Sequence, residues 1–306
     1  MSVSLKHRLE YYALRGVLAL LALLPRRAAL AVAERVALLG YWPLGIRRRV
    51  VTRQIAAALP ALTPREVRAV ARGAYRHLGR ITVELPLAAA AGRDTLLSFY
   101  ESADDFTPVR RAIEGGRGVV LITGHFGNWE LGGAYVPAMG FPHDVIVRRQ
   151  ANPLVDRWVN ARRAALGMTP VPDSEAVRRI PRAFRAGRPV GFVADQGVLG
   201  LASTFVPFFG RPAKTPRGPG VYAVKYDLPM IFCAAVRMPS GKYHFLVRPV
   251  AFEKTGDREA DVDAAVAAFT HVLEDCVREY PDQYFWHHRR WKRQPPQTPP
   301  EQREPI

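Results

Sequence analysis

The sequence predicts an α/β fold in which helices flank a mainly parallel central sheet. Residues 119–123, 144–147 and 190–194 are short apolar runs rich in β-branched side chains, which is typical of strands buried on both faces. Helical patterns follow the first two runs, and strands that alternate with helices indicate a parallel sheet. With 306 residues and 48% hydrophobic content, the chain can bury one large core.

Residues 1–45 precede this core and predict a helical membrane anchor. They are rich in Leu and Ala, but the longest uninterrupted apolar run, residues 17–24, is far shorter than the roughly 20 residues of a membrane span. We expect an amphipathic segment in the membrane interface, with arginines at the lipid headgroups. These arginines are Arg8, Arg15, Arg26 and Arg27. The alternative is a helical hairpin packed on the rest of the protein, and a cleaved signal peptide is not expected.

The segment from residue 46 to residue 90 predicts further helices. Thr63, Pro64 and Glu66 stand in the order of an N-cap, a first-turn proline and a capping-box glutamate. This segment carries no candidate catalytic group. A short helix is expected at 104–114, leading into the first buried strand.

The chain is organised around residues 118–130, which read GVVLITGHFGNWE. His125 follows the strand, Gly124 and Gly127 permit a tight turn, and Asn128 is a candidate N-cap for a helix to about residue 139. His125 in the turn and Glu130 in the first helical turn can then meet. A carboxylate on one imidazole nitrogen leaves the other nitrogen as a general base. Backbone N–H groups of residues 127–129 are candidates to stabilise an oxyanion.

Polar and basic residues follow the next two predicted strands. Arg148 and Arg149 come directly after residues 144–147, and Asp195 and Gln196 come directly after residues 190–194. In open α/β sheets, ligands bind at the carboxyl ends of the strands. We therefore place these side chains in the same site as His125.

A helix is predicted to begin at Asn152-Pro153 and to end near Arg162 and Arg163. Together with the arginines before the helix, these residues form two pairs that can bind phosphate bidentately. A basic helix is also expected at 174–186.

The last third of the chain predicts strands at 230–236 and 244–247 and a long helix at 261–280. The aromatic segment 204–210 suits the wall of an apolar groove or ordinary core packing. Residues 281–292 mix aromatic and cationic side chains, which suits a lipid and phosphate interface or the stacking of nucleic-acid bases. Residues 295–306, rich in Pro, Gln and Glu, predict a disordered tail. The main domain is therefore expected to span residues 46–294.

The formal net charge of +17 indicates acidic partners. No zinc-finger, RNA-recognition or helix-turn-helix signature is present, so nucleic acid is not expected as a partner. Cys233 and Cys276 lie in unlike contexts and suggest a reducing compartment. The motif HExxH is absent and His287-His288 lacks further candidate ligands, so no metal or other cofactor is expected.

Five blocks occur in order along the chain: GHFGNWE, RRQANPLVDRWVNARR, DQG, FVPFFGRPAKTPRG and PDQYFWHHRRWK. Over nearly its whole length the chain resembles the lipid A biosynthesis lauroyl/myristoyl acyltransferases, within the lysophospholipid acyltransferase-like superfamily. The resemblance implies a glycerophosphate-acyltransferase-like fold. It also implies transfer of a fatty acyl group from an acyl carrier protein thioester to a hydroxyl of a Kdo-lipid IVA type precursor. The reaction would take place at the cytoplasmic face of the inner membrane.

The resemblance also carries residue roles onto this sequence. His125 and Glu130 match the family's catalytic HX4E pair, Arg163 matches its functional arginine with Arg162 as the fallback, and Asp195 matches its aspartate. Arg163 and Asp195 are expected to bind the acceptor or to complete the site. Three further residues complete the predicted substrate-binding set: Arg149, Asn128 and Gln196.

Direct transfer without an acyl-enzyme is expected, because no Gly-x-Ser-x-Gly motif is present and neither cysteine has an evident base partner. The partners expected are the acyl carrier protein, a glycolipid acceptor and an anionic membrane surface, with the protein acting as a monomer. The Pro-Glu-Gly element of the glycerophosphate branch is missing. Two alternatives remain: an acyltransferase for phosphatidylinositol mannosides, and a non-catalytic protein that binds anionic membranes.

Overall fold

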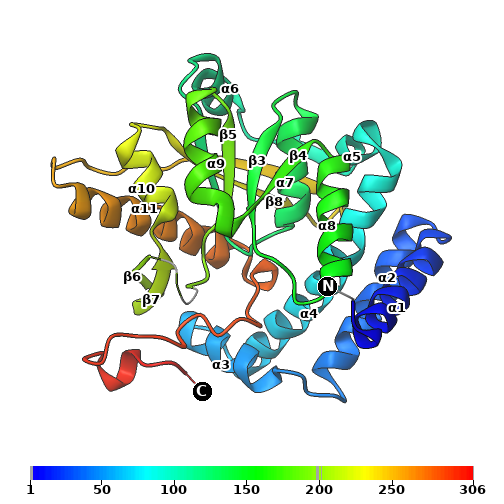
Figure 1. Ribbon diagram of the computed structural model, residues 1–306. Helices are drawn as coiled ribbons and strands as arrows, with labels where there is room; N and C mark the ends of the chain where they lie inside the picture. Colours follow the sequence, from blue (N-terminus) through cyan, green and yellow to red (C-terminus); the bar gives the residue numbers. More distant parts are fainter. Residues whose placement is uncertain (1–2, 198–199, 201, 306) are drawn as a thin grey trace.

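The computed structural model describes residues 3–197, 200 and 202–305, and its central element is a seven-stranded sheet (Figure 1). Neighbouring strands run parallel except β8 and β9, which are antiparallel. The predicted mainly parallel sheet is confirmed, and the predicted strands are found within a few residues of their expected bounds. In spatial order the strands are β1 (Tyr100–Ala103), β9 (Tyr243–Pro249), β8 (Met230–Arg237), β2 (Val119–Thr123), β5 (Pro189–Val193), β3 (His143–Val147) and β4 (Met168–Pro172).

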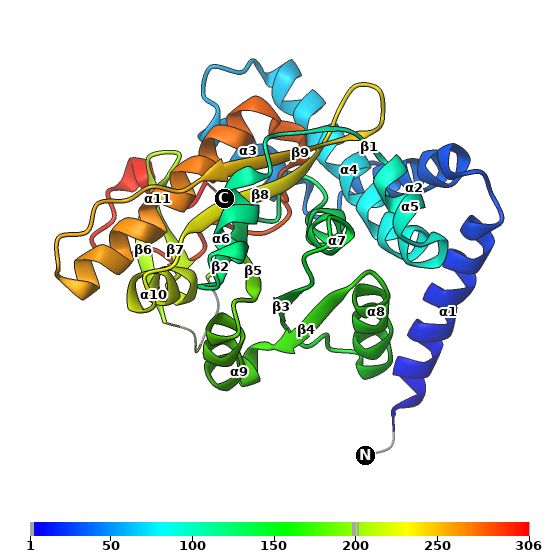
Figure 2. The same ribbon diagram turned by 90° about the horizontal axis from the view of Figure 1, so that it is seen from above.

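Helices cover both faces of this sheet. On one face lie α6 (Thr107–Glu114), α7 (Trp129–Ala138) and α8 (Pro153–Ala165); on the other lie α9 (Asp173–Arg185), α10 (Gly218–Lys225) and α11 (Arg258–Glu279). Figure 2 shows α7 and α8 on the opposite side of the sheet from α10 and α11. Strand β2 is buried on both faces as predicted: Ile122 packs in the α9 to α11 cluster and Leu121 in the α6 to α7 cluster.

The N-terminal helices pack on one long helix, α4 (Pro64–Ala91). The helices that contact it are α1 (Leu5–Ala22), α2 (Arg26–Tyr41), α3 (Arg48–Ala58) and α5 (Arg93–Ser98). The predicted capping box of Thr63 and Glu66 is present at the start of α4. Helix α2 approaches α4 so closely that a Cβ at Gly79 would lie 2.5 Å from the carbonyl oxygen of Ala33. In the described part of the chain, no helix is both long and apolar enough to cross a membrane.

The C-terminal aromatic segment packs inside the protein. Trp286 and Trp291 are fully buried in one core cluster with Phe208, which belongs to a two-stranded hairpin of β6 (Ser203–Phe208) and β7 (Arg211–Pro216). The alternative of core packing for residues 204–210 thus holds for Phe208. The predicted lipid interface at 281–292 is wrong for these two tryptophans, because the hairpin and α11 cover them.

The C-terminal residues also differ from the prediction. Residues 295–305, expected as a disordered tail, follow a defined path that includes a 3₁₀ turn, η2 (Pro300–Gln302). Arg289 binds the Glu304 carboxylate through two hydrogen bonds of 2.6 Å, and Arg211 donates to the carbonyl of Arg303. A similar turn, η1 (Pro281–Gln283), connects α11 to the aromatic segment.

Candidate active site

His125 and Asp195 form a pair at the carboxyl edge of the sheet. Strands β2 and β5 are parallel neighbours with Thr123 opposite Val193, so residues two positions further along each chain emerge side by side. Nδ1 of His125 lies 2.6 Å from Oδ1 of Asp195. This contact leaves Nε2 of the imidazole for a proton transfer.

The Asp195 carboxylate is buried and ionised. Its residue is only 1% exposed. Burial by itself would raise the carboxyl pKa, but the charge and hydrogen bond of His125, together with the charge of Arg290, lower the pKa of Asp195 to about 2. Arg290 is itself buried and donates to the Lys214 carbonyl and the Thr215 hydroxyl. The site therefore holds a fixed negative charge behind the imidazole.

Glu130 has a different partner from the one predicted. It lies in the first turn of α7 and accepts hydrogen bonds of 2.9 and 2.5 Å from Nε and Nη2 of Arg163, in the last turn of α8. The expected contact between Glu130 and His125 is replaced by the contact of His125 with Asp195. The physical reason is the parallel register of β2 and β5, which brings the buried aspartate to Nδ1, while the first turn of α7 directs Glu130 towards α8.

The turn that carries His125 is held by its surroundings. The carbonyl of His125 accepts a hydrogen bond from the Phe285 N–H, and the Trp129 ring lies 5.0 Å from the imidazole. Gly127 has a φ of +55°, and a Cβ there would lie 2.2 Å from the Ala235 carbonyl oxygen. Only glycine fits this position without displacing β8.

Two of the predicted oxyanion donors are already engaged. The N–H of Gly127 donates to the Gln283 carbonyl and the N–H of Asn128 donates to the Ala235 carbonyl. The prediction of an oxyanion hole at residues 127–129 is therefore wrong for these two groups. Their hydrogen bonds fix the turn against β8 and the C-terminal segment.

The predicted substrate-binding residues separate into three groups. Arg163 and Gln196 line a cavity that begins at His125. Asn128 is fully buried, where its amide binds Glu84 and Tyr243, and Asp195 lies behind His125, so neither is placed to contact a substrate. Arg149 is an exposed side chain, and its neighbour Arg148 lines the cavity instead.

The cavity has a volume of about 820 Å³. Cationic side chains from separate elements line it: Arg148 after β3, Arg163 on α8, Lys225 on α10 and Arg258 on α11. Lys225 and Arg258 were not predicted as site residues, since nothing in their local sequence distinguishes them from the other cations of a chain with 44 Lys and Arg residues.

Apolar and glycine residues line the part of the cavity under α7. The residues that line this part are Gly132 and Gly133 of α7, Gly191 of β5, Val145 of β3 and Met168 of β4. Glycines leave space between a helix and a sheet that side chains would otherwise fill. This apolar part of the lining is called the recess, and the end at the carboxyl edge of the sheet, with His125, Arg148 and Arg163, is called the mouth.

Comparison with known proteins matches residues 2–293 to the model of the bacterial lipid A biosynthesis acyltransferases. The chain belongs to this family. It is 25% identical over 259 residues to the lipid A biosynthesis lauroyltransferase of Escherichia coli K12, covering 83% of this chain and 81% of that protein. It is 26% identical over 282 residues to the palmitoleoyltransferase of the same strain and to an acyltransferase of Shigella flexneri, covering 92% of this chain and 90% of each relative.

As a lipid A biosynthesis acyltransferase, the protein is an enzyme that transfers acyl groups. Neither of its cysteines is suited to carry the acyl group, because burial raises the pKa of Cys233 strongly and that of Cys276 to about 12. Within residues 3–197, 200 and 202–305, no group of three His, Cys, Asp or Glu side chains is placed to hold a metal ion.

Proposed function

We propose that the protein moves a fatty acyl chain from an acyl carrier protein thioester to a hydroxyl of a phosphorylated lipid A precursor, with His125 as the general base. The observation that carries this proposal is the 2.6 Å contact between His125 and the buried Asp195 at the mouth of the cavity. A carboxylate on Nδ1 fixes the tautomer in which Nε2 accepts a proton.

In the proposed reaction, Nε2 of His125 takes the proton of the acceptor hydroxyl, and the oxygen attacks the thioester carbonyl. The new C–O bond forms a tetrahedral intermediate, the C–S bond then breaks, and the departing thiolate takes the proton from the imidazolium. Asp195 stabilises the imidazolium throughout. No acyl-enzyme is formed in this scheme.

We assign Glu130 to Arg163 rather than to His125. The two hydrogen bonds between Arg163 and Glu130 join the last turn of α8 to the first turn of α7 across the mouth of the cavity. The pair is 13% and 15% exposed, so solvent screens it weakly. The N-terminus of α7 also directs the positive end of its helix dipole towards this mouth, where an oxyanion would form.

The recess under α7 suits the acyl chain. From His143 to Val147, β3 rises by roughly 13 Å along the recess at about 3.3 Å per residue. An apolar recess along this strand suits an extended hydrocarbon chain, and the closed end of the recess would set the preferred chain length. A panel of acyl carrier proteins loaded with saturated chains of different length measures this preference directly.

Cationic side chains in the cavity lining suit a phosphorylated acceptor. Arg148, Lys225 and Arg258 come from three elements and line one cavity, and a guanidinium binds phosphate bidentately. The names of the three relatives support a lipid A precursor over a mannosylated phosphoinositide. The net charge of +17 also favours encounter with the acidic acyl carrier protein.

The outer face of α1 and α2 suits a membrane interface. Leu5, Leu9, Leu20 and Leu23 on or next to α1 are 63–80% exposed, and Val36 on α2 is 61% exposed. A water-exposed apolar face of this size is typical of helices that lie in the headgroup region. We propose that this hairpin rests on the cytoplasmic face of the inner membrane.

The test measures acyl transfer from labelled acyl carrier protein to a Kdo-bearing lipid A precursor in detergent, comparing wild type with His125→Ala. We expect transfer by wild type and a loss of at least about 10²-fold in the variant, the usual contribution of a general base. Equal transfer by both proteins contradicts the assignment of His125. If wild type does not transfer to this acceptor, transfer to a phosphatidylinositol mannoside is measured next, and a failure there too, with lipid vesicles still bound, supports the non-catalytic alternative.

A further inference from the structure

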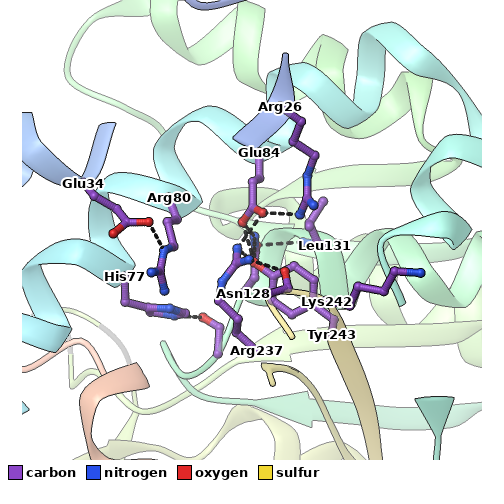
Figure 3. A network of polar contacts seen from close by, with 12 residues as sticks. Arg26, Glu34, His77, Arg80, Glu84, Asn128, Leu131, Arg237, Lys242 and Tyr243 are labelled. Carbon is purple, nitrogen blue, oxygen red and sulfur yellow. Dashed lines mark hydrogen bonds and ion pairs between the residues drawn. The ribbon is translucent and has the colours of Figure 1, made fainter. Parts of the chain in front are cut away.

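A buried polar network joins the N-terminal helices to the turn that carries His125 (Figure 3). At its centre is Glu84 of α4, which is fully buried. The Glu84 carboxylate accepts hydrogen bonds from Arg26 at 2.7 Å, from Arg237 at 2.5 Å, from Asn128 at 2.9 Å and from the Tyr243 hydroxyl. These four partners come from α2, from β8, from the turn that carries His125 (the catalytic turn of the proposed reaction) and from β9.

Asn128 connects this network to α7. Its Nδ2 donates to Glu84 and to the Tyr243 hydroxyl, while its Oδ1 accepts the N–H of Leu131 at 3.0 Å and so caps the helix. The capped first turn contains Glu130. One side chain thus determines both where α7 begins and how the turn sits on α4.

A second residue of α4 holds the same turn. His77 lies 3.0 Å from the carbonyl oxygen of Gly127 through its Nε2. His77 and Glu84 are seven residues apart, which is close to two helical turns, so they project from one face of α4. This face of α4 therefore contacts the turn at two successive residues, Gly127 and Asn128.

The charge on Glu84 makes the network dependent on its arginines. Burial would raise the pKa of Glu84, but the charges of Arg237 and Arg26 and the hydrogen bonds of Arg237 and Tyr243 lower it. A buried carboxylate that loses one cationic partner is left undercompensated and its neighbours rearrange. Arg26 is the partner that comes from the N-terminal hairpin; its side chain is 28% exposed and stacks 4.0 Å from the Phe99 ring centre.

We propose that Arg26 and Glu84 are positioning residues that couple the packing of the α1–α2 hairpin on α4 to the order of the catalytic turn. Arg26 was expected at the lipid headgroups, and the structure turns it inward to Glu84 instead. The hairpin then has a second role besides membrane attachment, because its docking on α4 holds the turn that carries His125. The link to turnover rests on the proposed function, whereas the link to the turn itself does not.

The test uses Arg26→Gln, with Arg35→Gln as the matched control. Arg35 lies on the same helix and is exposed, and no carboxylate contacts it among the residues that the structure describes. Three quantities are measured: hydrogen exchange of the Leu131 amide, kcat and KM for acyl transfer, and binding to vesicles that contain anionic lipid. Arg26→Lys, which keeps the charge, serves as the rescue variant.

We expect Arg26→Gln to speed exchange at Leu131 and to lower kcat by about 10-fold to 100-fold, the effect of a misplacement of about 1 Å in a catalytic group. KM and vesicle binding should change little, Arg26→Lys should recover most of the loss, and Arg35→Gln should match wild type in kcat and in exchange.

Unchanged exchange at Leu131 together with unchanged kcat in Arg26→Gln overturns the proposal. So does an equal rise in exchange across the central sheet, since that indicates general destabilisation. If wild type transfers no acyl group while Leu131 still responds to Arg26→Gln, the coupling holds and the proposed function fails.

Discussion

Replacement of Asp195 by Asn tests which carboxylate supports His125. The substitution keeps the size of a side chain that is 1% exposed and removes its negative charge. It also allows the amide NH₂ to face Nδ1, which would select the imidazole tautomer with its proton on Nε2. That tautomer cannot accept a proton from the acceptor hydroxyl.

The magnitude follows from the electrostatics of the pair. The pKa of Asp195 falls from an ordinary value of 3.8 to about 2 in spite of burial, with His125 as the main favourable cause. A shift of this size, at about 1.36 kcal/mol per pKa unit, corresponds to roughly 2 kcal/mol, of which the charge of Arg290 supplies a part. We expect kcat to drop by about 10-fold to 100-fold, and further where the wrong tautomer forms.

The assay is acyl transfer at saturating acceptor and donor, with Glu130→Gln as the control. Gln keeps hydrogen-bonding capacity towards Arg163 and leaves the pair of His125 and Asp195 untouched, so we expect a smaller loss in kcat than for Asp195→Asn. Circular dichroism checks that both variants are folded. A kcat for Asp195→Asn within about twofold of wild type, with a large loss for Glu130→Gln, refutes the assignment and restores Glu130 as the partner of His125.

Three further predictions follow from burial and shape. Burial, opposed at His77 by its contact with Gly127, lowers the pKa of His77 from 6.5 to about 4, and burial with a nearby arginine charge lowers that of His143 to about 3. Because both histidines bind a proton less readily in the folded state than in the unfolded state, the folded protein has its full stability above pH 6.5 and loses stability as the pH falls towards 4. The free energy of unfolding should therefore drop by roughly 2 kcal/mol per histidine from about pH 7 to about pH 5. A constant Tm over this range contradicts this prediction. Gly133→Leu should fill the recess beside Met168, whose sulfur would lie 3.0 Å from a Cβ at residue 133. The preferred acyl chain should then be shorter when donors of different chain length compete. An unchanged preference excludes the recess as the acyl site. Leu20→Glu on the exposed face of α1 should weaken vesicle binding about 10-fold to 100-fold, which is the effect expected when one leucine is lost from the membrane interface. Undiminished binding argues against the α1–α2 hairpin as the membrane anchor.

Local patterns were sufficient for most elements of the fold. The segment Val119–Thr123 is rich in β-branched residues and has too few polar side chains to lie at the protein surface, so a strand buried on both faces of a parallel sheet is expected for it. Likewise, Thr63 with Glu66 defined the start of α4, and Asn152 with Pro153 defined the start of α8. These signals depend only on neighbouring residues.

The candidate site was predictable as a set of residues but not as a set of pairs. His125 and Asp195 each follow a buried strand, so their placement at one edge of the sheet could be expected. Their direct contact depends on the register that sets Thr123 opposite Val193, and on β5 being the neighbour of β2. The glycine turn and the helix start allowed a contact between His125 and Glu130, and the position of Arg163 at the end of α8 decided otherwise.

The sequence alone determined the fold class, the residues of the turn that carries His125 and the family resemblance, because strand composition, caps and glycine turns act over short distances. Only the tertiary structure decided that Arg26 turns inward to Glu84, that Trp286 and Trp291 are core residues, and that Asp195 supports His125. Each of these outcomes joins residues far apart in the chain, and local sequence does not specify how distant strands and helices pack.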